Sequence, residues 1–187
     1  MTTLKVHNIE TAPEGSKALL ENSIKTYGMI PGLHGVLAGA PGILEAYKAL
    51  HQLFANSSFN NEELTVVWQT INVEHACHYC VPAHTGIAKM MKVDDAITEA
   101  LPNETPLENP KLEALRTMTL TIVRNRGHVT QEDLNTFYAT GYEERQVLEI
   151  ILGLSQKTIS NYVNHIANTP VDAGFKKFAW SKENVEV

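Results

Sequence analysis

The sequence predicts an all-α fold with a single domain, and three observations support this. Apolar residues recur at the three- and four-residue spacing of amphipathic helices along most of the chain. No segment shows the sustained alternation of apolar and polar residues that is typical of a half-buried strand. The length of 187 residues lies within the usual range for one domain. We expect this domain to cover residues 1–187, with a core at about 16–168 and a tail at 169–187.

The first part of the chain predicts three helices. Residues 16–27 carry a ragged apolar face at helical spacing. Residues 30–42 are interrupted by Pro31 and Pro41, which predicts a short helix between turns. Residues 42–54 have regular helical spacing and predict a longer helix.

The middle of the chain predicts two helices that a proline separates. Asn60 followed by Glu63 resembles a capping box, so a helix is expected to start near residue 61 and to run to about 76. Pro82 disfavours the interior of a helix but suits a first turn. We therefore expect a break near residues 77–81 and a second helix from about Val81 to Met91.

The remaining segments also read as helices. A short one should follow Asp94, the proline-rich residues 102–110 should form a loop, and a helix should cover 111–125. Thr130 has the character of an N-cap for a helix at 131–140 that Gly141 ends. A long helix is expected at 143–168, followed by a tail that is a short helix or an extended arm.

Composition limits the classes of partner. The net charge of −6 argues against nucleic acid as the main partner, because such proteins usually present a basic face. The N-terminus lacks the apolar region of a signal peptide, and no apolar stretch is long enough to cross a bilayer. We therefore expect a cytoplasmic protein without a membrane partner, in a compartment that keeps thiols reduced.

The two cysteines, Cys77 and Cys80, are the most informative residues. A structural disulfide would be unusual in the cytosol, and a two-residue spacer closes too small a loop to stabilise a fold much. A helix that begins near Val81 would place Cys80 at its N-terminus, where free N–H groups lower the pKa of a thiol. His84 would lie one turn later on the same side, where it could accept a proton. This geometry favours Cys80 as the attacking sulfur and Cys77 as the resolving one.

Other interpretations of the pair remain open. Both thiols could be structural and buried. Cys77, Cys80 and His84, with His75 or His78, could bind zinc, although structural zinc sites usually take ligands from two distant segments. The prediction is that no metal is bound. A thioredoxin-like motif would need a βαβ context, which this chain lacks.

The segment CHYCVPAHTG, which follows VVWQTINVE, resembles the Cys-x-x-Cys-x-x-x-His signature of the AhpD-like alkylhydroperoxidases in the carboxymuconolactone decarboxylase superfamily. The match is strongest over about residues 60–92. The resemblance implies an all-helical protein that forms homo-oligomers and reduces peroxides or disulfides. It also implies that Cys80 is the peroxidatic cysteine, Cys77 the resolving cysteine and His84 part of a proton relay.

The chain departs from this signature at two positions. The best-known relatives have a histidine immediately before the second cysteine, where this chain has Tyr79, and they have a relay glutamate about twelve residues before the first cysteine, where this chain has Thr65. We therefore name Glu74, Glu63 and Tyr79 as further candidates for the catalytic site. A helix cap is the alternative role for Glu63, and packing is the alternative role for Tyr79.

The function predicted from the sequence is reduction of hydroperoxides through a Cys77/Cys80 dithiol–disulfide cycle. No glycine-rich dinucleotide motif is present, so no cofactor is expected, and electrons should come from a dithiol donor. In the better-known relatives that donor is a lipoyl-bearing protein. Two alternatives remain: a redox-sensing or zinc-binding module without turnover, and a decarboxylase-type lyase. The cysteine pair argues against the lyase, because the lactone enzymes do not depend on one.

Overall fold

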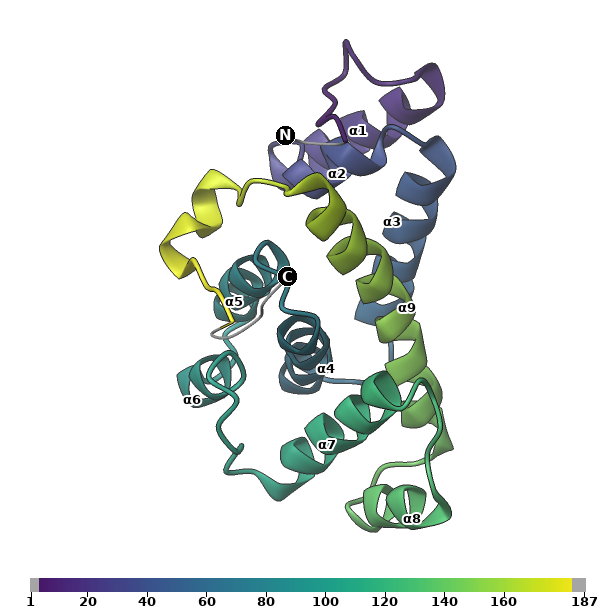
Figure 1. Ribbon diagram of the computed structural model, residues 1–187, viewed down its shortest axis with the longest axis vertical. Helices are drawn as coiled ribbons and strands as arrows, with labels where there is room; N and C mark the ends of the chain where they lie inside the picture. Colours follow the sequence, from purple (N-terminus) through teal and green to yellow (C-terminus); the bar gives the residue numbers. More distant parts are fainter. Residues whose placement is uncertain (1–3, 183–187) are drawn as a thin grey trace.

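The structure is a computed structural model that describes residues 4–182. These residues form helices and contain no strand, which confirms the predicted all-α fold (Figure 1). In chain order the elements are α1 (Glu14–Tyr27), α2 (Gly32–Leu37), α3 (Pro41–Ala55), α4 (Asn61–Glu74), α5 (Cys80–Met90), α6 (Asp95–Ala100), α7 (Pro110–Arg124), α8 (Gln131–Ala139), α9 (Glu144–Ala167) and the 3-10 helix η1 (Ala173–Phe178).

The helix boundaries follow the residues that predicted them. Asn60 and Glu63 form the expected capping box at the start of α4. Thr130 caps α8, with Asp133 as the reciprocal partner. Pro82 lies in the first turn of α5, where its missing N–H has no intrahelical partner to lose. Helix α9 is slightly shorter than the predicted helix at 143–168. Asn168 adopts a left-handed conformation and ends α9 at Ala167.

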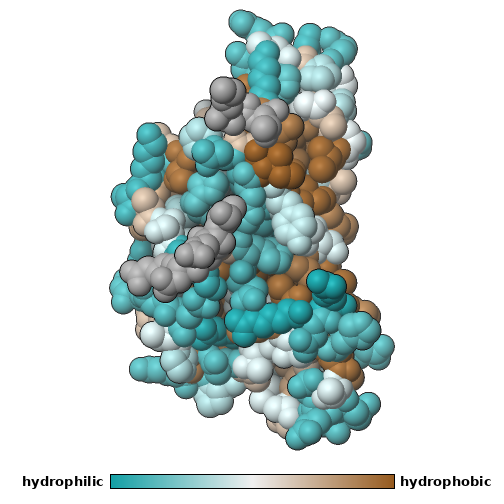
Figure 2. All heavy atoms as spheres, in the orientation of Figure 1, coloured by the Kyte–Doolittle hydropathy of each residue, from teal (hydrophilic) through white to brown (hydrophobic). Residues whose placement is uncertain are grey.

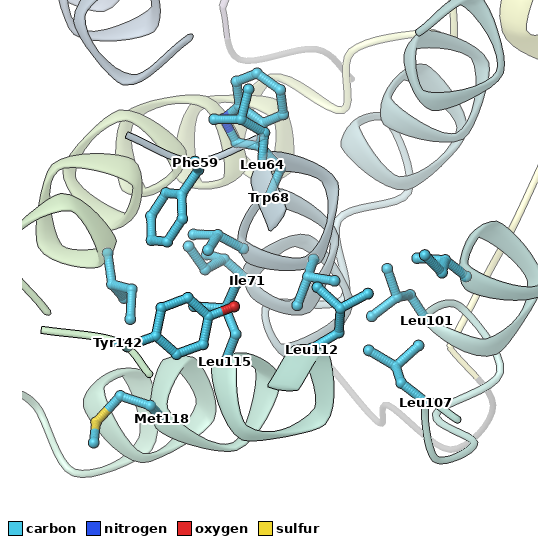
Figure 3. Close-up of a cluster of buried hydrophobic side chains, with 14 of the residues drawn as sticks. Phe59, Leu64, Trp68, Ile71, Leu101, Leu107, Leu112, Leu115, Met118 and Tyr142 are labelled. Atoms are coloured by element: carbon cyan, nitrogen blue, oxygen red, sulfur yellow. The ribbon is translucent and has the colours of Figure 1, made fainter. Parts of the chain in front are cut away.

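Helix α4 is the centre of the molecule and is surrounded by α5, α7 and α9 (Figure 1). Every residue from 63 to 73 is buried, so this helix contributes to the core on all sides rather than on one face. Its apolar residues pack with those of α6, α7 and the segment before α9 in the larger of two hydrophobic clusters (Figure 3). Residues labelled there include Trp68, Ile71, Leu112, Leu115 and Tyr142.

A second hydrophobic cluster holds the cysteines. Cys77, Tyr79 and Cys80 pack against apolar residues of α1, α2 and α3, among them Leu20, Leu33, Leu37, Leu44 and Tyr47. The turn between α4 and α5 therefore lies where the three N-terminal helices meet the central helix and α9. This placement removes both sulfurs from bulk solvent.

Helix α9 has an unusual distribution of polar residues. Its buried face is largely polar and contains Gln156, Lys157, Ser160, Asn161 and Asn164. Several apolar side chains of the same helix are instead exposed, namely Leu148, Ile151, Tyr162 and Ile166. Figure 2 shows further hydrophobic residues gathered on the surface over α1–α3 and α9. Self-association through such a face stays a prediction.

The segment after α9 returns across α5 (Figure 1). Asp172 accepts a hydrogen bond from the backbone N–H of Gly32, and the Nε1 of Trp180 donates to the carbonyl of Pro102. Phe175 packs directly on Gly86, where any Cβ would lie only 2.4 Å from the phenylalanine ring. We call residues 169–182 the C-terminal arm. Within the described residues, no helix combines the length and the apolar character that crossing a membrane requires.

Candidate active site

A tight turn between α4 and α5 brings the two sulfurs together. Ala76 adopts a positive φ of 52°, which reverses the chain after α4. Cys80 is the first residue of α5, and its backbone N–H donates a hydrogen bond to the Sγ of Cys77 at 3.3 Å. Both cysteines are free thiols, and their exposed fractions are 0% for Cys77 and 2% for Cys80.

Polar side chains of α4 hold the start of α5 in place. The Nδ2 of Asn72 donates to the carbonyl of Cys80 at 3.4 Å, and the Nε2 of Gln69 donates to the carbonyl of Val81 at 3.2 Å. The same amide of Gln69 also donates to the hydroxyl of Thr85. These buried bonds fix the first turn of α5, and therefore the position of Cys80, relative to the central helix.

Side chains of α9 surround the Cys80 sulfur. The Nδ2 of Asn164 donates a hydrogen bond to the Sγ of Cys80 at 3.3 Å. The Oγ of Ser160 donates to the carbonyl of Lys157 at 3.1 Å, and both residues lie near this sulfur. Asn161 donates to the Oδ1 of Asn72 at 3.0 Å, which joins α9 to the network on α4. Cys80 thus lies among several donors, as a sulfur that carries negative charge requires.

The two sulfurs differ in their electrostatic environment. Burial alone would raise the pKa of Cys80, but interactions with the polar side chains of Cys77, Asn164 and Ser160 and the nearby charge of Lys157 outweigh it and lower that pKa below its usual range. The pKa of Cys77 is raised, first by its hydrogen bond to Cys80 and then by burial. The environment of Cys80 therefore favours its thiolate more than that of Cys77 does.

Lys157 and His84 form a buried pair beside the cysteines. The Nζ of Lys157 lies 2.9 Å from the Nε2 of His84, and the lysine side chain is fully buried. Burial lowers the pKa of Lys157, while the Cys80 and Cys77 sulfurs oppose that change. Burial, Lys157 and His51 all lower the pKa of His84, so its imidazole is neutral and accepts the hydrogen bond.

A series of rings extends from His84 toward α3. The ring centroids of His84 and Trp68 are 4.9 Å apart, and those of Trp68 and His51 are 5.6 Å apart. Gln156 accepts from the Nε1 of Trp68 at 2.8 Å and lies within hydrogen-bond distance of His51 and Tyr47. His84 thus packs against Trp68 on one side and lies within hydrogen-bond distance of Lys157 on the other.

Tyr79, which lies between the two cysteines in sequence, connects the site to the C-terminal arm. Its hydroxyl donates to the Oδ2 of Asp172 at 2.6 Å and accepts from the backbone N–H of Leu33 at 3.2 Å. Desolvation, together with the charge of Asp172 and the hydrogen bond to it, raises the pKa of Tyr79. The tyrosine thus remains a protonated donor that anchors the arm and α2.

The other candidate metal ligands have different partners. His75 lies 2.9 Å from the Oδ1 of Asn161, and His78 donates to the carbonyl of Thr169 at 3.1 Å. Among residues 4–182, no cluster of three or more His, Cys, Asp or Glu side chains has an arrangement that could hold a metal ion.

The two glutamates named from the sequence bind residues elsewhere. Glu63 completes the capping box and accepts from the hydroxyl of Tyr142 at 2.9 Å. Glu74 forms two hydrogen bonds with the guanidinium of Arg124, at 2.9 and 2.7 Å. Within the described part of the chain, neither carboxylate contacts a cysteine. The structure therefore brings Cys77, Cys80, Tyr79 and His84 together and places Glu63 and Glu74 apart from the sulfurs.

The contribution of α9 to the site was not predicted from the sequence. A signal was present, because the polar residues at 156, 157, 160, 161 and 164 follow helical spacing and form one continuous face. A polar face of that kind is usually the solvated side of a helix. Here it is buried against α4 and α5, so it supplies the donors around Cys80.

A surface cleft lies elsewhere in the molecule. It is lined by residues of α6 and of the loop before α7, including Asp94, Glu99 and Glu108. Neither cysteine lines this cleft. Both sulfurs are almost fully buried, and this cleft does not reach them.

Comparisons with known proteins identify the fold. No protein-family model matches the sequence, and no curated protein is similar to it in a sequence search. The solved structures that are similar include an alkylhydroperoxidase AhpD core protein, an uncharacterized peroxidase-related protein from Ralstonia eutropha JMP134. It has a TM-score of 0.81 and 16% identity over 93% of this chain and 94% of that chain.

Two further structures resemble the chain. An uncharacterized peroxidase-related protein from Silicibacter sp. TM1040 has a TM-score of 0.78 and 17% identity, and 93% of each chain is covered. A cysteine-to-alanine variant of the debrominase Bmp8, in complex with 2,3,4-tribromopyrrole, has a TM-score of 0.72 and 16% identity, and 95% of each chain is covered. The chain therefore has the AhpD-like fold.

Proposed function

We propose that the protein is a thiol-dependent peroxidase that cycles Cys77 and Cys80 between a dithiol and a disulfide. One observation carries the proposal: the Cys80 sulfur accepts a hydrogen bond from Asn164 and lies near the buried Lys157, with the Cys77 sulfur as its neighbour. Donors that lower the pKa of one thiol beside a second thiol are what a two-cysteine peroxidase needs. The peroxidase-related proteins of the same fold support this assignment.

The first step is attack of the Cys80 thiolate on the terminal oxygen of a hydroperoxide. An S–O bond forms, the O–O bond breaks, and Cys80 becomes a sulfenic acid. The departing oxygen needs a proton to leave as an alcohol or as water. The buried pair of His84 and Lys157 lies beside the reacting sulfur and is the source of that proton in the proposed relay.

The second step is condensation of Cys77 with the sulfenic acid. The Cys77 sulfur bonds to the Cys80 sulfur, and the hydroxyl leaves with the thiol proton as water. A dithiol donor then reduces the disulfide by exchange. A lipoyl-bearing protein is the donor that the family resemblance implies, and the cytoplasm is the proposed compartment because it supplies reduced thiols.

The test is thiol titration of the reduced protein before and after one equivalent of hydrogen peroxide. We expect loss of both thiols, and mass spectrometry should find a bond between Cys77 and Cys80. Cys77→Ser should undergo one round of oxidation that ends at a sulfenic acid, which dimedone traps. Cys80→Ser should not consume peroxide. Full peroxide turnover by Cys80→Ser would overturn the proposal.

A second measurement tests for dehalogenation, because a debrominase has the same fold. Reduced protein is incubated with 2,3,4-tribromopyrrole, and bromide release is measured. Bromide release without consumption of hydrogen peroxide would replace the peroxidase proposal with a dehalogenation reaction at the same sulfur. Stoichiometric zinc together with the absence of titratable thiols would instead favour the metal-binding alternative.

A further inference from the structure

Lys157 is a fully buried lysine. In the proposed mechanism, the Cys80 thiolate is the one negatively charged group near it. The titratable groups that face it are Cys80, Cys77 and His84 from α5 and the turn before it, His51 from α3, and His75 at the end of α4. Among the described residues, no carboxylate is found beside its ammonium. A buried ammonium needs a partner of opposite charge, and the Cys80 thiolate is the group that can provide it.

The charge of this partner changes during the proposed reaction. When Cys80 forms a sulfenic acid or a disulfide, its sulfur becomes neutral. The ammonium would then be left buried with a neutral imidazole at 2.9 Å and no counter-ion. Such an isolated charge is costly inside a protein, and a lysine normally responds by releasing its proton.

We propose that Lys157 is the acid that gives its proton to the departing oxygen of the hydroperoxide, and that it stays neutral for as long as Cys77 and Cys80 form a disulfide. The inference rests on the proposed function and assigns a catalytic role to a residue whose buried ammonium lies near the reacting sulfur and is paired with His84. His84 acts as a positioning residue, because its Nε2 accepts the hydrogen bond of the ammonium and directs it.

The protons and electrons balance in this scheme. The reduced protein holds a Cys80 thiolate, a Cys77 thiol and a Lys157 ammonium. As the S–O bond forms and the O–O bond breaks, the lysine proton goes to the departing oxygen, and an alcohol leaves. Condensation with Cys77 then releases water, so the sulfurs have lost two electrons to the peroxide. On reduction by a dithiol, the proton that arrives at Cys80 returns to Lys157.

In this scheme, oxidation of Cys77 and Cys80 to a disulfide releases two protons, although Cys80 is already a thiolate. One proton comes from the Cys77 thiol and the other from the Lys157 ammonium. Dithiothreitol also releases two protons on oxidation below its thiol pKa. The equilibrium between the protein and dithiothreitol should therefore be independent of pH between about pH 6 and about pH 8. If Lys157 kept its proton, the ratio of reduced to oxidised protein would instead rise about tenfold for each pH unit, because only one proton would be released.

The experiment measures this equilibrium, and the ultraviolet absorbance of the thiolate, in the wild type and in three variants. Lys157→Met should lose the thiolate absorbance at neutral pH and keep the pH-independent equilibrium, because both cysteines are then thiols. Lys157→Arg should keep the thiolate but show a change of about tenfold per pH unit, since arginine does not release its proton. The control is Lys48→Met, which removes a half-buried lysine that binds Ser23 and should behave as the wild type.

Three results would overturn the inference. These are a tenfold change per pH unit in the wild type, a wild type that shows no thiolate between about pH 6 and about pH 8, and a thiolate absorbance that Lys157→Met leaves unchanged. The wild-type measurement decides the matter even if Lys157→Met does not fold. The equilibrium with dithiothreitol involves no peroxide, so failure of the peroxidase proposal appears separately, as the absence of peroxide consumption.

Discussion

The Nδ2 of Asn164 donates a hydrogen bond to the Sγ of Cys80 at 3.3 Å, and these residues are 84 positions apart in the sequence. The bond connects the last turns of α9 to the first residue of α5. In the proposed mechanism its acceptor is the sulfur that carries the negative charge, so its strength depends on the ionisation of Cys80.

Replacement of Asn164 by alanine should raise the pKa of Cys80. A hydrogen bond to a charged group contributes roughly 1.5–3 kcal/mol, which corresponds to a rise of about one pH unit or more. The measurement is the pH dependence of alkylation of Cys80 by iodoacetamide. Ser155→Ala, at an exposed position on the same helix, is the control. An unchanged profile for Asn164→Ala would show that the bond does not stabilise the thiolate.

The buried histidines predict a loss of stability in mild acid. Burial lowers the pKa of His34 to about 3 and that of His51 to about 4, with the neighbouring positive charges as lesser causes. In the unfolded chain each histidine binds a proton near its usual pKa of about 6.5, whereas the folded protein keeps it neutral. The free energy of unfolding is therefore highest above about pH 6.5, the pKa of histidine in the unfolded chain. It decreases as the pH falls toward the pKa of the folded state, by up to about 1.4 kcal/mol per pH unit for each histidine.

Urea denaturation at a series of values between about pH 7 and about pH 5 tests this prediction, because carboxylates contribute little in that range. His34→Gln should be less stable than the wild type at neutral pH, because it loses the packing of the ring against Tyr47. Its stability should nevertheless depend less steeply on pH. A slope equal to that of the wild type would mean that His34 is protonated in the folded state.

Glu63 and Glu74 remain the acids that the sequence predicted for the relay, and two substitutions test them. The contacts of Glu63 with Tyr142 and of Glu74 with Arg124 predict that Glu63→Gln and Glu74→Gln change the rate of peroxide consumption by less than about twofold. The stability of Glu74→Gln should fall by less than about 1 kcal/mol, because Arg124 is half exposed. A decrease in rate of about tenfold or more in either variant would restore that residue to the catalytic mechanism.

Substitution of Tyr79 by phenylalanine should loosen the C-terminal arm. The variant loses the bonds to Asp172 and to the backbone of Leu33, which join the arm and α2 to the turn that carries the cysteines. We expect a bulky disulfide reagent to react faster with Cys80, while the rate with iodoacetamide changes little. Tyr162→Phe, at an exposed site on α9, is the control. Equal acceleration of both reagents would indicate general unfolding rather than release of the arm.

Local sequence signals were sufficient for the helices but not for the complete site. Asn60 with Glu63, Thr130 and Pro82 each act within one turn of the chain, so the boundaries they predict agree with the structure. Cys77, Cys80 and His84 are likewise close in sequence, and their grouping followed from spacing. Lys157 and Asn164 reach the site through tertiary packing, 73 positions from His84 and 84 from Cys80 respectively. Spacing alone cannot reveal a partner at such a separation.

For the proposed peroxidase, the burial of both sulfurs limits the kind of reductant that can reach them. A hydroperoxide is small enough to enter by a brief local opening, but the flat surface of a folded protein cannot approach a sulfur that is only 2% exposed. A dithiol at the end of a long, slender arm can pass through such an opening and leave again. For the same reason, bulky cellular thiols should form mixed disulfides with Cys80 slowly, so a reactive sulfur can persist in a thiol-rich compartment without being blocked.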